Sequence, residues 1–174
     1  MIPPGTAALP NFKHLRPVGT IYTKRLYVPP RNSNEGFPGV TDRFEWFAID
    51  YTGRFWIPVQ GKYQFSLTSD DGSKLYIDRK VIIDNDGGHP PLGCAAVVEL
   101  ASGIHDIRVS YFQGPRYYVA LMLLVAPPGA SWRVFDTADF TPPPDSPLWK
   151  FQAAQPVSGK KRVGRVKGGK CWAQ

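Results

Sequence analysis

The stretch GKYQFSLTSDDGSKLYIDRKVIIDN, residues 61–85, decides the fold class. Its first part alternates apolar and polar residues, as expected for an antiparallel strand with one buried face. After the polar interruption at residues 69–73 the pattern resumes as two short strands around Asp78 and Arg79, which we expect to form a hairpin turn. Because glycine would adopt this turn more easily than Arg79, we expect a positive φ there with a small strain.

Further strands are predicted on both sides of this segment. Before it, residues 20–28 alternate like an edge strand, and residues 43–57 are apolar on both faces with a turn expected at Thr52 and Gly53. After it, the predicted strands are residues 94–103, residues 103–114 and the strongly apolar run 117–127. The segment RVFDTADF, residues 133–140, closes the domain, since the prolines of TPPPDSP cannot continue a paired strand.

Length and composition support a single all-β domain. The chain has 174 residues, 13 % aromatic residues, 17 glycines and 18 prolines, which suits strands joined by tight turns. We therefore predict an antiparallel β-sandwich or barrel over residues 18–141. Residues 1–17 are expected to form an extended Pro-rich arm, and residues 142–174 a Pro-rich linker with a basic tail.

The positive charge of the chain is concentrated in that tail. The formal net charge is +7, and seven basic residues follow position 149 with no acid among them: Lys150, Lys160, Lys161, Arg162, Arg165, Lys167 and Lys170. The rest of the chain is therefore neutral. Such a tail can bind phosphate, anionic lipid or an acidic protein surface, with Trp172 as an aromatic anchor, or it can be a solvated end.

The two cysteines, Cys94 and Cys171, are interpreted as free thiols, because small secreted domains that rely on disulfides usually contain more. Pairing of the two would have to tie the tail back onto the domain. The N-terminus lacks the pattern of a secretion signal, and no apolar run is long enough to span a bilayer. These features favour a cytoplasmic location or one peripheral to a membrane complex.

Two stretches together resemble the PA14 domain: residues 44–87, from FEWFAIDYTG to KVIIDNDG, and LASGIHDIRVSYFQG at residues 100–114. The resemblance covers roughly residues 17–140. It implies a sandwich or barrel-like β fold that serves as a carbohydrate-binding or protein-contact module. In lectin-like PA14 domains, two adjacent aspartates joined by a cis peptide hold a calcium ion that binds sugar hydroxyls, and Asp70 and Asp71 match that pair.

Two interpretations of Asp70 and Asp71 stay open. Adjacent carboxylates can supply oxygens to Ca²⁺, which takes about six to eight oxygen ligands. The same residues are also typical of a polar turn between strands. Lectin-like members complete the site with an Asn from a later loop, where this chain has Gln113 and Arg116. The Gln113 carbonyl can serve as a ligand, whereas Arg116 would disfavour the ion or pair with Asp71 in its place.

Other polar and aromatic residues are candidates for the rim of a ligand site. Asp84 and Asp86 lie in a segment that resembles the start of a calcium loop, but the later acid and the flanking helices of an EF-hand are missing. We expect these two residues to shape a cleft beside Asp70. Tyr117 and the neighbouring Tyr118 are candidates to stack on a sugar ring or to contact a protein.

No catalytic arrangement is found in the sequence. The three histidines, His14, His89 and His105, are expected in the arm, in a loop and on the apolar face of a strand, and no nucleophile, zinc or phosphate-loop motif occurs. Adjacent carboxylates cannot flank a glycosidic bond from opposite sides. We therefore predict that the chain is not an enzyme.

Two functions remain as hypotheses. In the first, the domain is an accessory subunit that docks onto a larger protein assembly, or onto an anionic lipid surface, through its extended termini. In the second, it is a calcium-dependent glycan-binding module that uses Asp70 and Asp71. Sequence-specific binding of nucleic acid is not expected, because the neutral core offers no basic stripe and no recognition helix.

Overall fold

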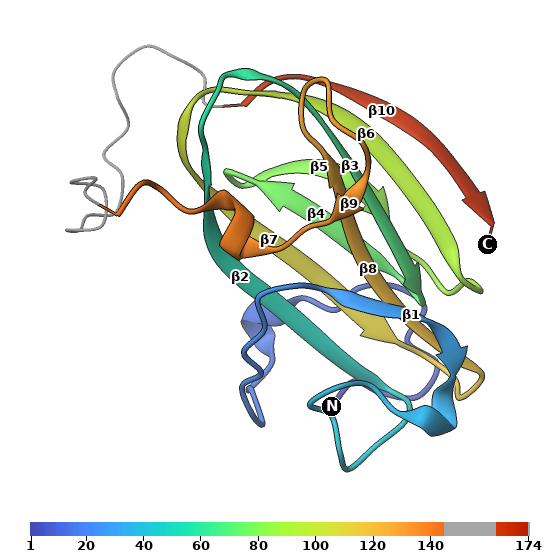
Figure 1. Cartoon of the computed structure of the whole chain (residues 1–174). Coiled ribbons are helices and arrows are strands. Elements are labelled where there is room, and N and C mark those ends of the chain that lie inside the picture. The colour runs from blue at the N-terminus through green and yellow to red at the C-terminus, as the bar shows by residue number, and fades with distance from the viewer. Residues whose placement is uncertain (145–162, 174) are drawn as a thin grey trace.

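The computed structural model of the chain describes residues 1–144 and 163–173 (Figure 1). The prediction of an all-β antiparallel fold is confirmed: two antiparallel sheets pack face to face. Within the described residues, one sheet has the strand order β1-β8-β3-β6-β10, with β9 added to β8, and the other has the order β2-β7-β4-β5. Over the same residues, no helix has the length and apolar character needed to cross a membrane.

The strands of the larger sheet are β1 (Tyr27–Asn32), β3 (Gly61–Asp70), β6 (Leu92–Leu100), β8 (Tyr118–Ala126), β9 (Arg133–Val134) and β10 (Val163–Ala173). Those of the smaller sheet are β2 (Phe47–Ile57), β4 (Ser73–Ile77), β5 (Lys80–Asn85) and β7 (Gly103–Gln113). Three short 3-10 turns accompany them: η1 (Phe12–His14), η2 (Ser33–Glu35) and η3 (Thr137–Phe140). The strands β3 and β4 follow each other in the chain but belong to different sheets, so the turn between them connects the two layers.

The inner faces of both sheets form one apolar core. Phe55 of β2 and Phe65 of β3 meet across the layers with their ring centroids 6.5 Å apart. Phe135 and Phe140 pack against Phe55 from the segment after β9, at 5.5 and 6.0 Å. Burial of large apolar side chains is the main stabilising contribution in such a sandwich.

The β4–β5 hairpin confirms the prediction made for residues 73–85. Its turn residues, Asp78 and Arg79, both have positive φ angles, of 48° and 68°. The Asp78 carboxylate binds the buried His105 ring, whose Nδ1 lies 2.8 Å from Asp78 Oδ2, and the other ring nitrogen faces the Ala101 carbonyl at 2.9 Å. His105 is thus a hydrogen-bonded core residue, as expected from its place on an apolar strand face.

Two predicted local features differ from the structure. Thr52 and Gly53 do not form a turn, because β2 runs through them and pairs with Arg108 and Ile107 of β7. The predicted edge strand at residues 20–28 is largely absent: β1 begins at Tyr27. It contains Pro29 and Pro30 within a register shift between Val28 and Arg31. Local alternation cannot show which residues have a neighbouring strand to pair with.

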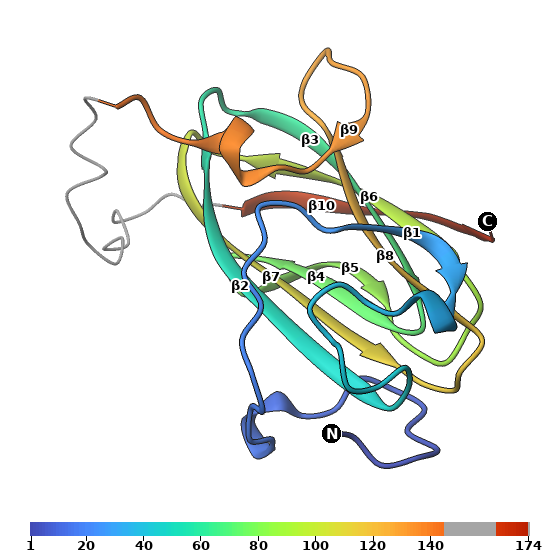
Figure 2. The same ribbon diagram turned by 60° about the horizontal axis from the view of Figure 1, so that its bottom comes forward.

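The N-terminal segment packs on its own domain. The Ile2 side chain is buried, and its N–H donates to the Trp46 carbonyl at 3.2 Å. The Leu9 N–H donates to Asp86 Oδ1 at 2.7 Å, which ties the segment to the loop after β5. Figure 2 shows this segment passing under the smaller sheet before the chain enters β1. Residues 1–17 therefore have partners within the chain itself.

The C-terminal segment differs most from the prediction. Residues 163–173 form β10, which pairs with β6 at the edge of the larger sheet (Figure 1). Cys171 lies opposite Cys94 in this pairing, and the two form a disulfide. The interpretation of both cysteines as free thiols is therefore wrong. Sequence alone could not give this pairing, since 77 positions separate the two residues.

Candidate functional site: an acidic pair between the two sheets

Asp70 and Asp71 lie where the chain passes from one sheet to the other. Asp70 is the last residue of β3, and β4 begins at Ser73. The peptide bond between the two aspartates is cis. Both residues are almost fully buried, with 5 % and 6 % of their surface exposed. Gly72 follows the pair because a side chain has no room there: an added Cβ would lie 2.5 Å from the Phe112 ring.

The Asp71 carboxylate joins two loops through backbone hydrogen bonds. Its Oδ1 accepts the N–H of His89, in the β5–β6 loop, at 3.1 Å. Its Oδ2 accepts the N–H of Gly114, in the β7–β8 loop, at 2.7 Å. Each carboxylate oxygen has a second lone pair, so both can still bind a cation or another donor.

Both aspartates are harder to ionise than usual. Burial, reinforced by the neighbouring charge of Asp71, raises the pKa of Asp70 to about 7. Burial also raises the pKa of Asp71, although the hydrogen bonds from Gly114 and His89 oppose the shift. Of the ion pairs formed within the described residues, none involves either aspartate. His89 opposes the upward shift of both pKa values, but no Lys or Arg pairs with the aspartates, so a bound cation would stabilise the two ionised carboxylates.

Gln113 supports this pair, but not through the atom expected from the sequence. Its Oε1 accepts the hydroxyl of the buried Tyr111 at 2.5 Å. Its Nε2 donates to the Tyr118 carbonyl at 2.9 Å and lies 3.4 Å from Asp71 Oδ2. The Gln113 Oε1 thus accepts from Tyr111 and its Nε2 faces the aspartate, while the role of this carbonyl as a metal ligand stays a prediction.

Asp84 and Asp86 share a cation, Lys74, and their role at the rim of a ligand cleft stays a prediction. The Lys74 Nζ lies 3.2 Å from Asp84 Oδ2 and 3.1 Å from Asp86 Oδ2. Asp86 Oδ1 also accepts the Leu9 and Gly87 N–H groups. These carboxylates thus neutralise Lys74, and Asp86 also fixes the N-terminal segment.

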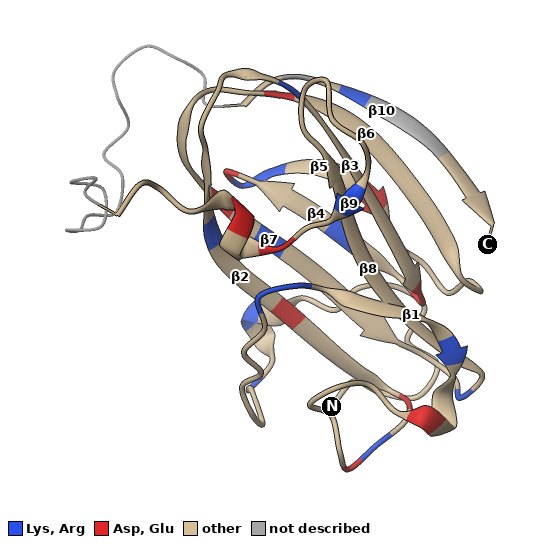
Figure 3. Cartoon of the chain, in the orientation of Figure 1, with Lys and Arg blue, Asp and Glu red and all other residues tan. Residues whose placement is uncertain are grey.

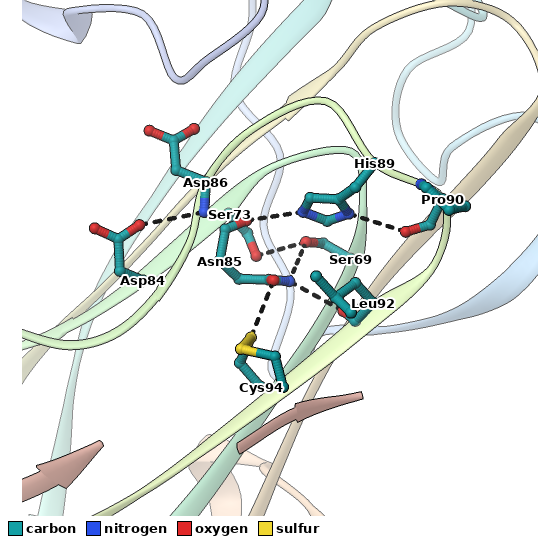
Figure 4. Close-up of a disulfide and its surroundings, with 10 residues drawn as sticks. Ser69, Ser73, Asp84, Asn85, Asp86, His89, Pro90, Leu92 and Cys94 are labelled. Atoms are coloured by element: carbon teal, nitrogen blue, oxygen red, sulfur yellow. Dashed lines mark hydrogen bonds between the residues drawn. A yellow bond between two sulfur atoms is a disulfide. The ribbon is translucent and has the colours of Figure 1, made fainter. Parts of the chain in front are cut away.

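Asn85 and His89 are site residues that the sequence analysis did not assign. Asn85 points inward between its two acidic neighbours, and its Nδ2 donates to Ser69 Oγ at 3.1 Å and to the Leu92 carbonyl at 3.0 Å (Figure 4). The backbone carbonyl oxygen of Asn85 lies 3.0 Å from His89 Nε2. Alternation along β5 could have revealed Asn85, because it shares an inward face with Ile83.

The disulfide reaches the edge of the same network. The Cys94 sulfur lies 3.1 Å from Asn85 Oδ1 (Figure 4). A sulfur bonded to another sulfur has no proton to donate, so this approach is a packing contact and not a hydrogen bond. Cys94 therefore packs against the residue that supports the β5–β6 loop.

Arg116 and Tyr117 belong to the β7–β8 loop, and no hydrogen bond or ion pair among the described residues joins the Arg116 side chain to the acidic pair. The Arg116 Nε and Nη2 groups donate to Asn34 Oδ1 at 3.1 and 2.7 Å, and the guanidinium lies 4.6 Å from the centroid of the Phe44 ring. This arrangement differs from the predicted pairing with Asp71. The Tyr117 side chain is exposed to solvent.

The candidate partner-binding tail is described only in part. Lys160, Lys161 and Arg162 lie outside the described residues, and Arg165 and Lys170 are placed on β10 by their backbone alone. Lys167 is exposed on the same strand. Trp172 is 41 % exposed and packs over Gly93, whose added Cβ would lie 3.0 Å from the indole. In the view of Figure 3, basic and acidic residues are interspersed over the body of the domain.

The residues of the acidic pair fit a hard divalent cation in part. Asp70 and Asp71 supply carboxylate oxygens, the ligands that Ca²⁺ prefers. Within the described part of the chain, no group of three or more His, Cys, Asp and Glu side chains could hold a metal together. The remaining ligands would therefore have to be backbone carbonyls, water or hydroxyls of a bound molecule.

The raised pKa of Asp70 predicts a pH dependence of the metal-free protein. Because the folded state holds the Asp70 proton up to about pH 7, while the unfolded chain releases it near pH 4, folding stability should fall as pH rises between these values. Urea denaturation in EDTA at half-unit steps would measure this slope. We expect Asp70→Asn to make the slope flatter. An equal slope in both proteins would contradict the assigned burial of the Asp70 charge.

Comparison with known proteins gives the family. The family model for the PA14 domain matches residues 31–132, which is more than half of the chain. Among curated protein sequences, none matches at the significance required.

Solved structures with a similar fold were also found. An anti-sigma factor domain-containing protein superposes with a TM-score of 0.64 at 17 % identity, over 80 % of this chain and 48 % of that one. Another anti-sigma factor domain-containing protein, from Clostridium clariflavum, superposes with a TM-score of 0.58 at 18 % identity, over 88 % of this chain and 50 % of that one. A PA14 sugar-binding domain from an RTX adhesin superposes with a TM-score of 0.46 at 20 % identity, over 52 % of this chain and 51 % of that one.

This chain thus spans about half the length of the solved structures that it matches. The two superpositions with TM-scores of 0.64 and 0.58 agree with the two-sheet β fold, and the family match covers every strand from β2 to β8. The chain belongs to the PA14 domain family.

Proposed function

We propose that this PA14 domain is a calcium-dependent glycan-binding module whose ion is held by Asp70 and Asp71. PA14 domains are typically binding modules, and this pair matches the calcium-binding pair of the lectin-like members. The observation that carries the proposal is the burial of two adjacent carboxylates with which no Lys or Arg among the described residues forms an ion pair. A bound calcium ion would supply open coordination positions for vicinal sugar hydroxyls.

The surrounding loops support this use of the pair. Asp71 is fixed by the N–H groups of His89 and Gly114, so its oxygens are oriented before any ion binds. Arg116, the cation nearest to it in the β7–β8 loop sequence, is turned to Asn34 and Phe44. A preorganised pair of oxygens with no competing guanidinium favours binding of a divalent ion.

Calorimetric titration of Ca²⁺ into the metal-stripped protein tests the proposal. We expect saturable binding that Asp71→Asn weakens by about 100-fold, because one of the two anionic ligands becomes neutral. Asp106→Asn, which removes an exposed carboxylate on β7, is the matched control and should bind as the wild type does. A glycan array with and without EDTA would then identify the sugar.

Absence of binding heat, together with an unchanged melting temperature in excess calcium, would refute the calcium site. Binding of the same strength in Asp71→Asn would place the ion elsewhere. Circular dichroism of each variant shows whether the fold is retained, so that loss of binding can be separated from loss of structure.

Docking of the chain as an accessory subunit is a second candidate. It is supported by the exposed Lys167 and Trp172 on the edge strand β10, which carries part of the basic charge of the tail. The contacts of Ile2 and Leu9 within the domain show that part of the N-terminal segment is held by the chain itself, so docking through this segment is less well supported. Retention of a partner by the full chain and its loss on Trp172→Ala with Lys167→Ala would support this role.

A further inference from the structure

A solvent-open groove is lined in part by the β7–β8 loop, the loop whose Gly114 N–H donates to Asp71. Six residues line it, and we call it the tyrosine groove: Asn32, Ser33, Asn34, Arg116, Tyr117 and Tyr118. Its volume is about 490 Å³, which is large enough for a sugar residue. The lining comes from the end of β1, from η2 and from the β7–β8 loop, three segments that meet at one end of the sandwich (Figure 1).

The groove and the acidic pair share the β7–β8 loop as a common wall. On one side of this loop, the Gly114 N–H donates to Asp71 Oδ2. On the other side, the Tyr117 carbonyl accepts the Ser33 N–H at 3.0 Å. Gln113 also links the two, since its amide contacts both Asp71 and the Tyr118 carbonyl. The same short loop therefore contacts Asp71 and lines the groove, and this is the structural link between the two sites.

The exposed rings of the groove match a sugar. Tyr117 is 72 % exposed and Tyr118 52 %, which is far more than a tyrosine that serves the core. Aromatic rings presented in this way bind the apolar face of a pyranose, while the phenol hydroxyls bind its polar edge. The tyrosines therefore favour a carbohydrate over a small inorganic ion.

Arg116 gives the groove a positive charge, and its guanidinium is held in one orientation. It is the one charged residue among the six that line the groove. Its Nε and Nη2 groups already donate to Asn34 Oδ1, and the Phe44 ring supports the guanidinium plane. Among the described residues, the hydrogen bonds of the guanidinium use Nε and Nη2 and leave Nη1 for a ligand. Held in this way, Arg116 can donate to a carboxylate with little loss of side-chain entropy.

From these contacts we propose that the tyrosine groove is a subsite for an acidic sugar, with Arg116 binding its carboxylate and Tyr117 and Tyr118 stacking on its ring. The inference rests on the proposed calcium-dependent binding, because the acidic sugar continues from the residue held at Asp70 and Asp71. It names a class of ligand: glycans that carry a uronic or sialic acid.

The test uses the full chain, saturated with calcium, on a panel of uronic-acid and sialic-acid oligosaccharides, each paired with its carboxyl-reduced form. We expect at least about tenfold tighter binding of the acidic member of a pair, the size of one charge-assisted contact. Arg116→Gln should reduce this ratio to about one without changing affinity for the reduced glycan. Arg116→Lys should retain part of this preference for the acidic glycan, since lysine keeps the positive charge but lacks the planar guanidinium that binds a carboxylate through two hydrogen bonds.

The possible failures can be told apart. Calcium-dependent binding of acidic and reduced glycans with equal affinity would overturn the acidic-sugar subsite and leave the proposed function intact. An acidic preference that survives Arg116→Gln would overturn the role of Arg116. Absence of calcium binding would overturn the proposed function itself, and calcium binding without any glycan signal would overturn its glycan part and the subsite together.

Discussion

Removal of the Cys94–Cys171 disulfide is expected to lower the free energy of unfolding by about 2–5 kcal/mol. The crosslink joins residues 77 positions apart, so it restricts a large loop of the unfolded chain. It also fastens β10, an edge strand whose only strand partner in the described sheet is β6. Urea denaturation of the double variant Cys94→Ala and Cys171→Ala, beside the oxidised wild type, measures the effect.

Reduction provides the control for this prediction. A thiol reductant should shift the wild-type transition toward that of the double variant and leave the variant unchanged. Hydrogen exchange should show the loss of protection first in β10 and β6, with β2 and β7 retaining theirs. Identical transitions for the oxidised wild type and the double variant would show that the crosslink does not form in solution.

Replacement of Phe55 by alanine is expected to destabilise the fold by about 3–5 kcal/mol, because the cavity left in a close-packed core is filled only partly. Phe55 is buried at the centre of the sandwich and contacts Phe65 of the opposite sheet together with Phe135 and Phe140. The midpoint of urea unfolding measures the loss. Phe55→Leu should retain part of the stability, since it leaves a smaller void.

Tyr22→Ala is the matched control, because it truncates an aromatic side chain that is 92 % exposed. We expect this change to alter stability by less than about 0.5 kcal/mol. A loss of less than about 1 kcal/mol in Phe55→Ala would contradict the face-to-face packing of the two sheets at this position.

Sequence patterns predicted the features that depend on neighbouring residues. The turn at Asp78 and Arg79 is a local property and was predicted correctly. The strand β3 was also predicted, but its alternation indicated one buried face, whereas Ser66 and Thr68 on the other face are buried as well. Thr52 and Gly53 are also typical turn residues, yet β7 provides a long partner strand that keeps β2 extended through them. Tertiary pairing thus decided between two conformations that the local sequence permits.

In the candidate site too, the sequence predicted which residues take part but not how their side chains are oriented. Asp70 and Asp71 could be found from their adjacency and from the family resemblance. The direction of the Gln113 amide depends on Tyr111, and that of the Arg116 guanidinium depends on Asn34. Such orientations are set by contacts between distant segments, so a residue pattern can nominate the side chain but cannot say which of its atoms faces the ligand.

The prolines of β1 have a consequence for the behaviour of the protein at high concentration. β1 forms one edge of the larger sheet, and an open edge usually offers N–H groups to which the strand of another molecule can pair. Pro29 and Pro30 have no N–H, and they occupy the register shift between Val28 and Arg31. This edge is therefore protected against strand-by-strand growth into aggregates, which leaves β10, the opposite edge of the described sheet, as the strand to which another molecule could pair.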